Sequence, residues 1–153
     1  MHQTVTLSLL LILGLAAPAL GDGWEHYENP RFRFAIDVPE GFVAKPAPDN
    51  GDGQKWTTPD GYAELIAYGS FGSGFEEERT AAKDDPAQRY FASGKNWFVT
   101  SGIRDRTIFY EKRIRGCDDA VITFRFEYPA LRKISYDGLI KRIGKSLRSL
   151  PCG

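Results

Sequence analysis

Residues 120–128, AVITFRFEY, alternate between apolar and polar side chains and are followed by a proline at position 129. Successive side chains of a β-strand point to opposite faces of a sheet, so this period of two predicts a strand with one buried face. Proline lacks the amide hydrogen that a sheet ladder needs, and it is expected to end the strand. The face predicted to be buried carries Ile122, Phe124, Phe126 and Tyr128.

Three further β-prone runs precede this strand at short intervals. They are residues 88–93 (QRYFAS), 96–104 (NWFVTSGIR) and 106–114 (RTIFYEKRI), with turn residues at Ser93-Gly94 and Asp105-Arg106. Closely spaced runs joined by short turns are typical of antiparallel strands. We therefore predict that the four runs form an antiparallel meander.

The pattern changes after the meander, in residues 136–150, YDGLIKRIGKSLRSL. Its apolar side chains recur at helical spacing, which predicts an amphipathic helix. The apolar stripe consists of Leu139, Ile140, Ile143, Leu147 and Leu150, and the opposite face carries Lys141, Arg142, Lys145 and Arg148. A basic amphipathic helix can bind a membrane surface or nucleic acid, but we expect this one to dock its apolar side on the sheet.

The N-terminal half supplies the remaining elements. Residues 31–38, RFRFAIDV, alternate like a half-buried strand, and residues 54–58 and 62–69 flank Pro59-Asp60-Gly61, a strong hairpin signal. A short helix is expected over residues 75–83, with Ser73 as its cap. The fold class predicted is α+β: a single antiparallel sheet of about six to seven strands, packed by an N-terminal segment, a mid-chain helix and the C-terminal helix.

The first residues resemble an export signal. Residues 5–20, VTLSLLLILGLAAPAL, are almost wholly apolar and end in small residues. We predict a signal peptide over residues 1–21 and a single domain over 22–153, located in the periplasm or secreted. The preceding residues, MHQT, contain no Lys or Arg, so an N-terminal anchor that is not cleaved remains the alternative.

The chain contains two cysteines, Cys117 and Cys152. In an exported protein an even number of cysteines favours a disulfide, and this one would tie the C-terminus to the body of the domain. Two free thiols are the alternative.

Catalytic and metal-binding patterns are missing from the predicted mature sequence. It has one histidine, His26, and it lacks GxSxG, CxxC and HExxH. The acidic pairs Asp84-Asp85 and Asp118-Asp119 fall in predicted loops. We expect no catalytic residues, no cofactor and no metal. Lys and Arg total 20, as do Asp and Glu, so no net charge favours nucleic acid.

Residues 48–56, PDNGDGQKW, place acidic and amide side chains among glycines, as calcium loops do. With Gly53 at the glycine position of an EF-hand loop, the first and last ligand positions fall on Pro48 and Pro59, which lack side-chain oxygens. The stretch is therefore predicted to be a turn that leads into a strand. Together with the next turn it offers a candidate partner surface, made of Asn50, Asp52, Trp56, Asp60 and Tyr62. Plain turns are the alternative.

The order of these motifs resembles a known group of folds. It begins with FAIDVPEGF (residues 34–42), continues through the NGDG and PDG turns to WFVTSG (97–102) and IFYEK (108–112), and ends with FRFEYP and YDGLIKRIGKSL. The pattern resembles uncharacterised exported bacterial proteins and, more remotely, the PsbP/Mog-type α/β/α sandwich. That group includes photosystem II extrinsic subunits, a Ran-binding import factor and envelope proteins. The resemblance implies a role in binding or assembly and brings no catalytic set with it.

The function expected from the sequence is an exported, non-enzymatic binding or accessory protein. Its partner would be an envelope protein or a small ligand. Two alternatives remain: a hydrolase-type enzyme that uses loop carboxylates, and a membrane-peripheral envelope protein that binds through Lys141, Arg142, Lys145 and Arg148.

Overall fold

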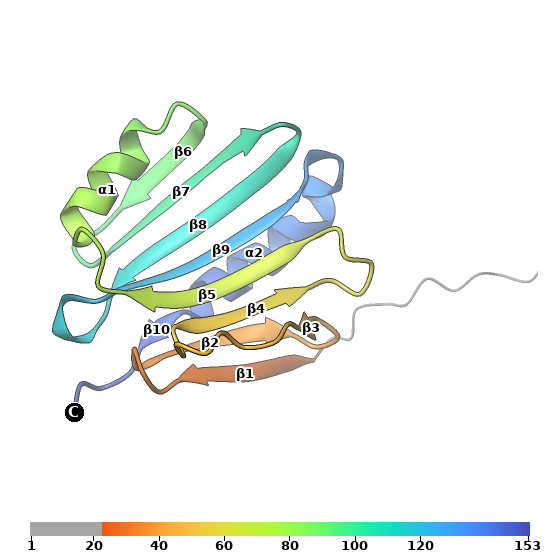
Figure 1. Ribbon diagram of the computed structural model, residues 1–153. Helices are drawn as coiled ribbons and strands as arrows, with labels where there is room; N and C mark the ends of the chain where they lie inside the picture. Colours follow the sequence, from red (N-terminus) through yellow and green to blue (C-terminus); the bar gives the residue numbers. More distant parts are fainter. Residues whose placement is uncertain (1–22) are drawn as a thin grey trace, which may run out of the picture.

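A computed structural model describes residues 23–153 and contains ten strands and two α-helices in this range (Figure 1). The elements are β1 (Trp24–Asn29), β2 (Phe34–Pro39), β3 (Val43–Ala44), β4 (Gly53–Thr57), β5 (Glu64–Ser70), α1 (Phe75–Asp84), β6 (Gln88–Ser93), β7 (Trp97–Arg104), β8 (Thr107–Arg115), β9 (Val121–Pro129), α2 (Lys133–Ser146) and β10 (Arg148–Ser149), with 3₁₀ turns η1 (Cys117–Asp119) and η2 (Ala130–Arg132). The predicted signal peptide lies outside the described residues.

The main sheet has seven strands in the order β3-β4-β5-β9-β8-β7-β6, and every neighbouring pair is antiparallel. After β5 the chain passes through α1 and enters the far edge of the sheet as β6. From there β7, β8 and β9 return step by step until β9 pairs with β5. The predicted meander is therefore confirmed. Its Asp105-Arg106 turn has positive φ at both residues, 46° and 68°, as a tight hairpin requires.

A second, smaller sheet covers part of the first and has the order β1-β2-β10. The expected strand over residues 31–38 is present, but it begins at Phe34 because Arg33 adopts a positive φ of 51° in the turn after β1. The expected N-terminal segment is thus a β-hairpin, and one more strand joins it from the C-terminal end of the chain.

The C-terminal helix is confirmed, but it is shorter than its apolar stripe predicts. It ends at Ser146, and Leu147 takes extended backbone angles that lead into β10. The amide of Leu150 donates to the carbonyl of Arg33 at 2.6 Å. Pairing with the exposed backbone of β2 therefore replaces the last helical turn.

The two helices lie on opposite faces of the seven-stranded sheet (Figure 1). α2 packs on β2, β8 and β9, whereas α1 packs on β6 and β7. The larger core lies on the α2 side and includes Phe34, Ile36, Leu65, Phe124, Phe126, Ile140 and Ile143; the smaller core, under α1, is Phe75, Ala82, Phe98 and Val121. The predicted α+β class is confirmed.

The start of α1 differs from the prediction. Gly74, not Ser73, is the N-cap residue, and no side chain caps the helix. Gly74 has a φ of 97°, a conformation open to glycine and strained for other residues. Glu76, Glu77 and Glu78 occupy the first turn, where the positive end of the helix dipole stabilises negative charge.

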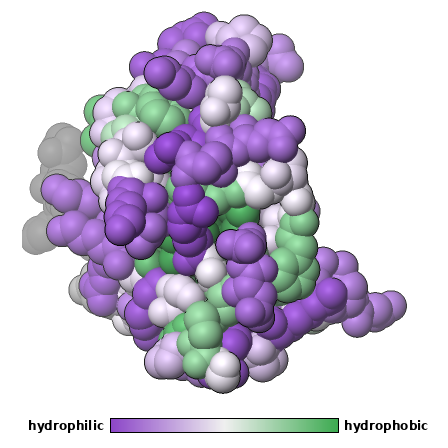
Figure 2. All heavy atoms as spheres, turned by 90° about the vertical axis from the view of Figure 1, so that its left-hand side faces the viewer, coloured by the Kyte–Doolittle hydropathy of each residue, from purple (hydrophilic) through white to green (hydrophobic). Residues whose placement is uncertain are grey.

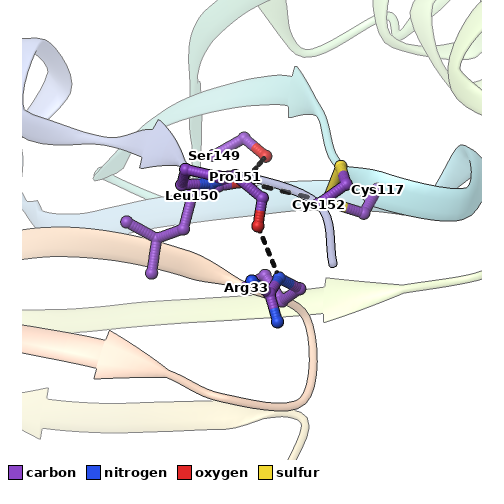
Figure 3. The surroundings of a disulfide bond; sticks show 6 residues. All are labelled: Arg33, Cys117, Ser149, Leu150, Pro151 and Cys152. Carbon is purple, nitrogen blue, oxygen red and sulfur yellow. Dashed lines mark hydrogen bonds between the residues drawn. A yellow bond between two sulfur atoms is a disulfide. The ribbon is translucent and has the colours of Figure 1, made fainter.

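The predicted disulfide is present and joins Cys117, the first residue of η1, to Cys152 (Figure 3). The chain after β10 is held at two further points. The Nε atom of Arg33 donates to the carbonyl of Pro151 at 2.6 Å (Figure 3). The amide of Leu150 donates to the carbonyl of Arg33. The C-terminal segment is therefore attached to both sheets.

Within residues 23–153, neither helix combines the length and hydropathy that crossing a membrane requires.

Candidate functional site

A groove of about 590 Å³ separates α2 from the outer strands of the main sheet. The sheet extends beyond α2 toward its β6 edge. On the face that carries α2, no helix in the described part of the chain therefore covers β6 and β7 or the adjoining part of β8. Cross-strand register places Tyr90, Ser101 and Tyr110 next to one another on this face, and Val99 beside Lys112. We call this space the α2 groove.

The floor of the α2 groove is apolar and aromatic. Val99 is buried, and Tyr110 packs against the core residue Phe124 with a ring separation of 5.6 Å. Trp97 and Tyr90 extend the floor outward, and the Trp97 side chain is 39% exposed. Aromatic surface of this kind binds the apolar part of a ligand and keeps a polar edge for orientation.

The rim of the α2 groove is basic. It carries Lys112, Lys133, Lys141 and Lys145, with Asp137 as its one acidic residue. Lys133 is paired with Asp137 at 2.7 Å, whereas no carboxylate in residues 23–153 lies within salt-bridge distance of the other three lysines. The whole chain carries balanced charge. The lysines are thus a local concentration of positive charge beside an apolar floor.

Burial changes the protonation behaviour of the groove. It lowers the pKa of the Lys112 ammonium, which donates a hydrogen bond to the Gly144 carbonyl of α2. Burial also raises the pKa of Tyr128 to about 12, and the Asp137 carboxylate contributes to the same shift. The pKa of Tyr110 is raised as well, by burial and then by Tyr90. At neutral pH both tyrosines therefore keep their protons and can donate hydrogen bonds.

The basic face predicted for the C-terminal helix is divided between different surroundings. Lys141 and Lys145 line the α2 groove. The guanidinium of Arg142 lies 4.0 Å from the ring centroid of Trp24, and Arg148, which follows the helix, lies 3.4 Å from the His26 ring. The four cations therefore do not form one continuous surface.

The face of the molecule beside the β8–β9 connection is mostly polar (Figure 2). Figure 2 shows the side of the molecule that lies at the left of Figure 1, where the β8–β9 connection is. Most of this surface is hydrophilic, and hydrophobic side chains show in a hollow near its centre (Figure 2).

The structure separates the residues of the predicted partner surface. Asn50 and Asp52 precede β4 and Asp60 and Tyr62 follow it, so the two pairs lie at opposite ends of the strand. Trp56 lies between them, but its side chain is only 4% exposed and belongs to the core. Alternation along β4 turns Trp56 inward and Lys55 outward. The indole is not part of any surface that a partner could reach.

The first of these two ends is stabilised by its own polar contacts. Gly51 has a φ of 68°, and the Asn50 amide donates to the Asp52 carboxylate at 2.6 Å. Arg31 forms an ion pair with Asp52 at 2.8 Å, and the Asn29 amide donates to the Gly51 carbonyl. The oxygens that resemble calcium ligands in the sequence thus stabilise a turn.

The second end forms a small cluster around Asp60. Hydrogen bonds from the Thr58 hydroxyl, the Tyr62 amide and Arg132 lower the pKa of Asp60 to about 2. The guanidinium of Arg132 lies 4.6 Å from the Tyr62 ring centroid, and Tyr62 is 61% exposed. This turn therefore fixes the segment that leads into α2.

The acidic pairs considered for hydrolysis lie at opposite ends of the main sheet. Asp84 is the last residue of α1, and Asp85, the next residue, pairs with Arg104. Asp118 and Asp119 lie in η1, which connects β8 to β9. Within residues 23–153, no three His, Cys, Asp or Glu side chains are grouped so that they could hold a metal ion.

A buried carboxylate lies instead between α1 and the sheet. Glu111 of β8 is paired with Arg113 at 2.7 Å and lies 3.7 Å from Arg125. Burial raises its pKa, and the two arginines counteract this effect only in part. Arg113 is also paired with Glu78 of α1 at 3.2 Å, so the cluster connects the helix to the sheet.

The raised pKa of Glu111 makes its ionised form unfavourable in the fold. A carboxyl whose folded pKa exceeds the unfolded value stabilises the protein below the unfolded pKa, and this contribution is lost as pH rises through the folded pKa. We expect Glu111→Gln to be at least as stable as wild type at neutral pH, with the difference shrinking on acidification. Urea unfolding over a pH series measures this.

Glu127→Gln is the matched control, because Glu127 pairs with the same Arg125 but is more exposed. It should change stability by less than about 0.5 kcal/mol. A loss of more than about 1 kcal/mol in Glu111→Gln at neutral pH would show that the ion pairs outweigh the cost of burial.

Sequence reasoning named Lys141 and Lys145 but missed the aromatic residues of the groove. The groove aromatics come from three different strands, β6 (Tyr90), β7 (Trp97) and β8 (Tyr110). They are brought together only by the order of these strands in the sheet. They remain uncovered because α2 packs on β8 and β9 and not on β6 and β7. The signal in the sequence was alternation: Tyr90 and Ala92 share one face of β6, and Trp97, Val99 and Ser101 share one face of β7.

Neither a protein-family model nor a curated protein matches the chain. Among solved structures, the solution structure of cyanobacterial PsbP (CyanoP) from Synechocystis sp. PCC 6803 is similar, with a TM-score of 0.58. The two chains are 9% identical, and the match covers 89% of this chain and 99% of CyanoP. At this identity the similarity concerns the fold alone, and the chain has a PsbP-like α+β fold.

Proposed function

We propose that this protein is an exported, non-enzymatic binding protein that takes an amphiphilic carboxylate in the α2 groove. The observation that carries the proposal is the combination of an aromatic floor with a lysine rim in one groove of about 590 Å³. The apolar body of the ligand would lie on Trp97, Val99 and Tyr110. Its carboxylate would lie at Lys141 and Lys145.

The charge of the rim favours an anion over a neutral ligand. Lys112, Lys141 and Lys145 have no carboxylate within salt-bridge distance among the described residues, so a ligand carboxylate would supply the missing counter-charge. An ion pair beside apolar surface is less screened than one in open water. The apolar floor in turn excludes small inorganic anions as good ligands, because they would leave it uncovered.

The chemistry of the groove supports binding over catalysis. Its tyrosines have raised pKa values, and Asp137 is engaged by Lys133. His26 contacts Asp37 and Glu28 on the smaller sheet, whereas the groove lies on the larger one. The disulfide supports export, because disulfides persist in oxidising compartments.

Fluorescence titration tests the proposal, since Trp97 lines the groove. Dodecanoate should change the indole emission at lower concentration than dodecanol, which has the same chain length and no charge. In the Lys141→Gln/Lys145→Gln variant the affinity for dodecanoate should fall by about tenfold, with dodecanol unaffected.

Lys83→Gln, on the exposed side of α1, is the control and should bind both compounds as wild type does. Equal affinities of wild type for dodecanoate and dodecanol would refute the anionic ligand. If neither compound binds, the groove is not the site of such a ligand.

A further inference from the structure

Two aliphatic side chains project fully into solvent where β9 leads into α2. Leu131 is 102% exposed and Ile134 is 94% exposed, the highest values among large apolar side chains in residues 23–153. Leu131 lies in η2 and Ile134 in the first turn of α2. We call this pair the aliphatic tip. In Figure 1 it belongs to the corner at which the blue chain turns from β9 into α2.

Other exposed apolar residues are partly supported by neighbours. The Phe71 ring lies 5.0 Å from the ring of Phe32, and Tyr62 lies beneath Arg132. Leu131 and Ile134 belong to neither core cluster, even at its margin. The fold therefore gains no burial from them, and their apolar surface is available to something outside the chain.

Basic residues lie next to the aliphatic tip in sequence and continue from it along one side of α2. Arg132 and Lys133 separate its two members in sequence. Lys141 and Lys145 follow Ile134 by seven and eleven residues, and at about 100° per residue both lie within about 20° of it around the helix axis. One side of α2 thus presents Ile134 at its start and two lysines without carboxylate partners behind it.

Exposed aliphatic side chains together with unpaired lysines suit the surface of an anionic lipid bilayer. Arg132 and Lys133 are engaged by Asp60 and Asp137, so the available charge is that of Lys141 and Lys145. A convex tip buries little against a flat protein surface, but a bilayer admits aliphatic side chains between its headgroups whatever their shape. Lysines on the same side of the helix would meet anionic headgroups.

From these observations we infer that the aliphatic tip docks this protein on the surface of an anionic lipid bilayer. Docking there brings the α2 groove to the membrane, because Lys133 and Asp137, adjacent to the tip, line the groove at that end. An amphiphilic carboxylate could then pass between bilayer and groove. Lys141 and Lys145 belong to both the docking surface and the groove, whereas Leu131 and Ile134 are not among the groove residues. Replacing the two aliphatic residues therefore tests docking separately from the proposed function.

Vesicle flotation tests the inference. Wild type, Leu131→Ser/Ile134→Ser and Val43→Ser are expressed as the full chain in one host, and intact mass defines the N-terminus of each. Val43 is an exposed aliphatic residue on edge strand β3 and is the matched control. Vesicles contain phosphatidylcholine alone or phosphatidylcholine with phosphatidylglycerol.

Wild type and Val43→Ser should float with the vesicles that contain phosphatidylglycerol and should be released by salt. The double variant should bind these vesicles at least about tenfold more weakly, because it removes the apolar part of the contact. Its circular dichroism and its affinity for dodecanoate should equal those of wild type. The comparison uses protein whose intact mass shows that residues 1–21 have been removed, because an apolar N-terminal segment would itself bind vesicles. For this protein, equal flotation of all three variants, or no flotation of wild type, would overturn the inference and would leave a protein partner as the occupant of the tip.

Discussion

The Cys117→Ser/Cys152→Ser variant is expected to lose about 4 kcal/mol of unfolding free energy relative to the oxidised wild type. The disulfide joins residues that are 35 positions apart, and removing it restores the conformational entropy of that loop to the unfolded chain. The closed loop contains β9, α2 and β10, which supply much of the larger core. Urea unfolding followed by far-ultraviolet circular dichroism measures the loss.

Reductant provides the control for this prediction. Wild type in excess dithiothreitol should unfold at the same urea concentration as the serine variant, and dithiothreitol should leave the serine variant unchanged. A difference between oxidised wild type and the variant of less than about 1 kcal/mol would show that the contacts of the C-terminal segment hold it without the covalent bond. Those contacts are the backbone bond from Leu150 to Arg33 and the bond from Arg33 to Pro151.

Strands such as β5 and β9 could be predicted because their side chains alternate between a face packed in the larger core and a face that is less buried. In β9, Ile122, Phe124 and Phe126 point toward α2, and Arg125 and Glu127 point away. This geometry imposes a period of two on the sequence, and tight turns such as Asp105-Arg106 mark the ends. Local pattern and tertiary structure agree, so pattern alone was sufficient.

The ends of the C-terminal helix and the composition of the groove could not be predicted in the same way. Leu147 and Leu150 continue a helical stripe, but the edge of β2 offers backbone hydrogen bonds to this segment and takes it into β10. The groove depends on the same kind of distant partner. Three of its four lysines come from α2, and its aromatic residues come from strands earlier in the chain. Trp97, for example, precedes Lys133 by 36 positions.

Trp56→Ala is expected to destabilise the protein by about 3–5 kcal/mol, the range for removing a large buried aromatic side chain. The indole is 4% exposed and packs edge-on against Tyr27 of β1 with a ring separation of 5.1 Å. It is opposite Leu65 on β5, which is in turn opposite Phe126 on β9. Trp56 therefore connects the smaller sheet to the core of the larger one. Urea unfolding at neutral pH measures the effect.

Tyr62→Ala provides the comparison, because Tyr62 was assigned to the same predicted surface and its side chain is 61% exposed. It should cost less than about 1 kcal/mol, through the lost contact with Arg132. If Trp56→Ala were as mild as Tyr62→Ala, the indole would contribute little to the contact between the sheets. If the expected difference is found, any loss of partner binding in Trp56→Ala must be attributed to unfolding. A partner surface on this side of the molecule then has to be tested at the exposed turns, with Tyr62 at one end of β4 and Asn50 at the other.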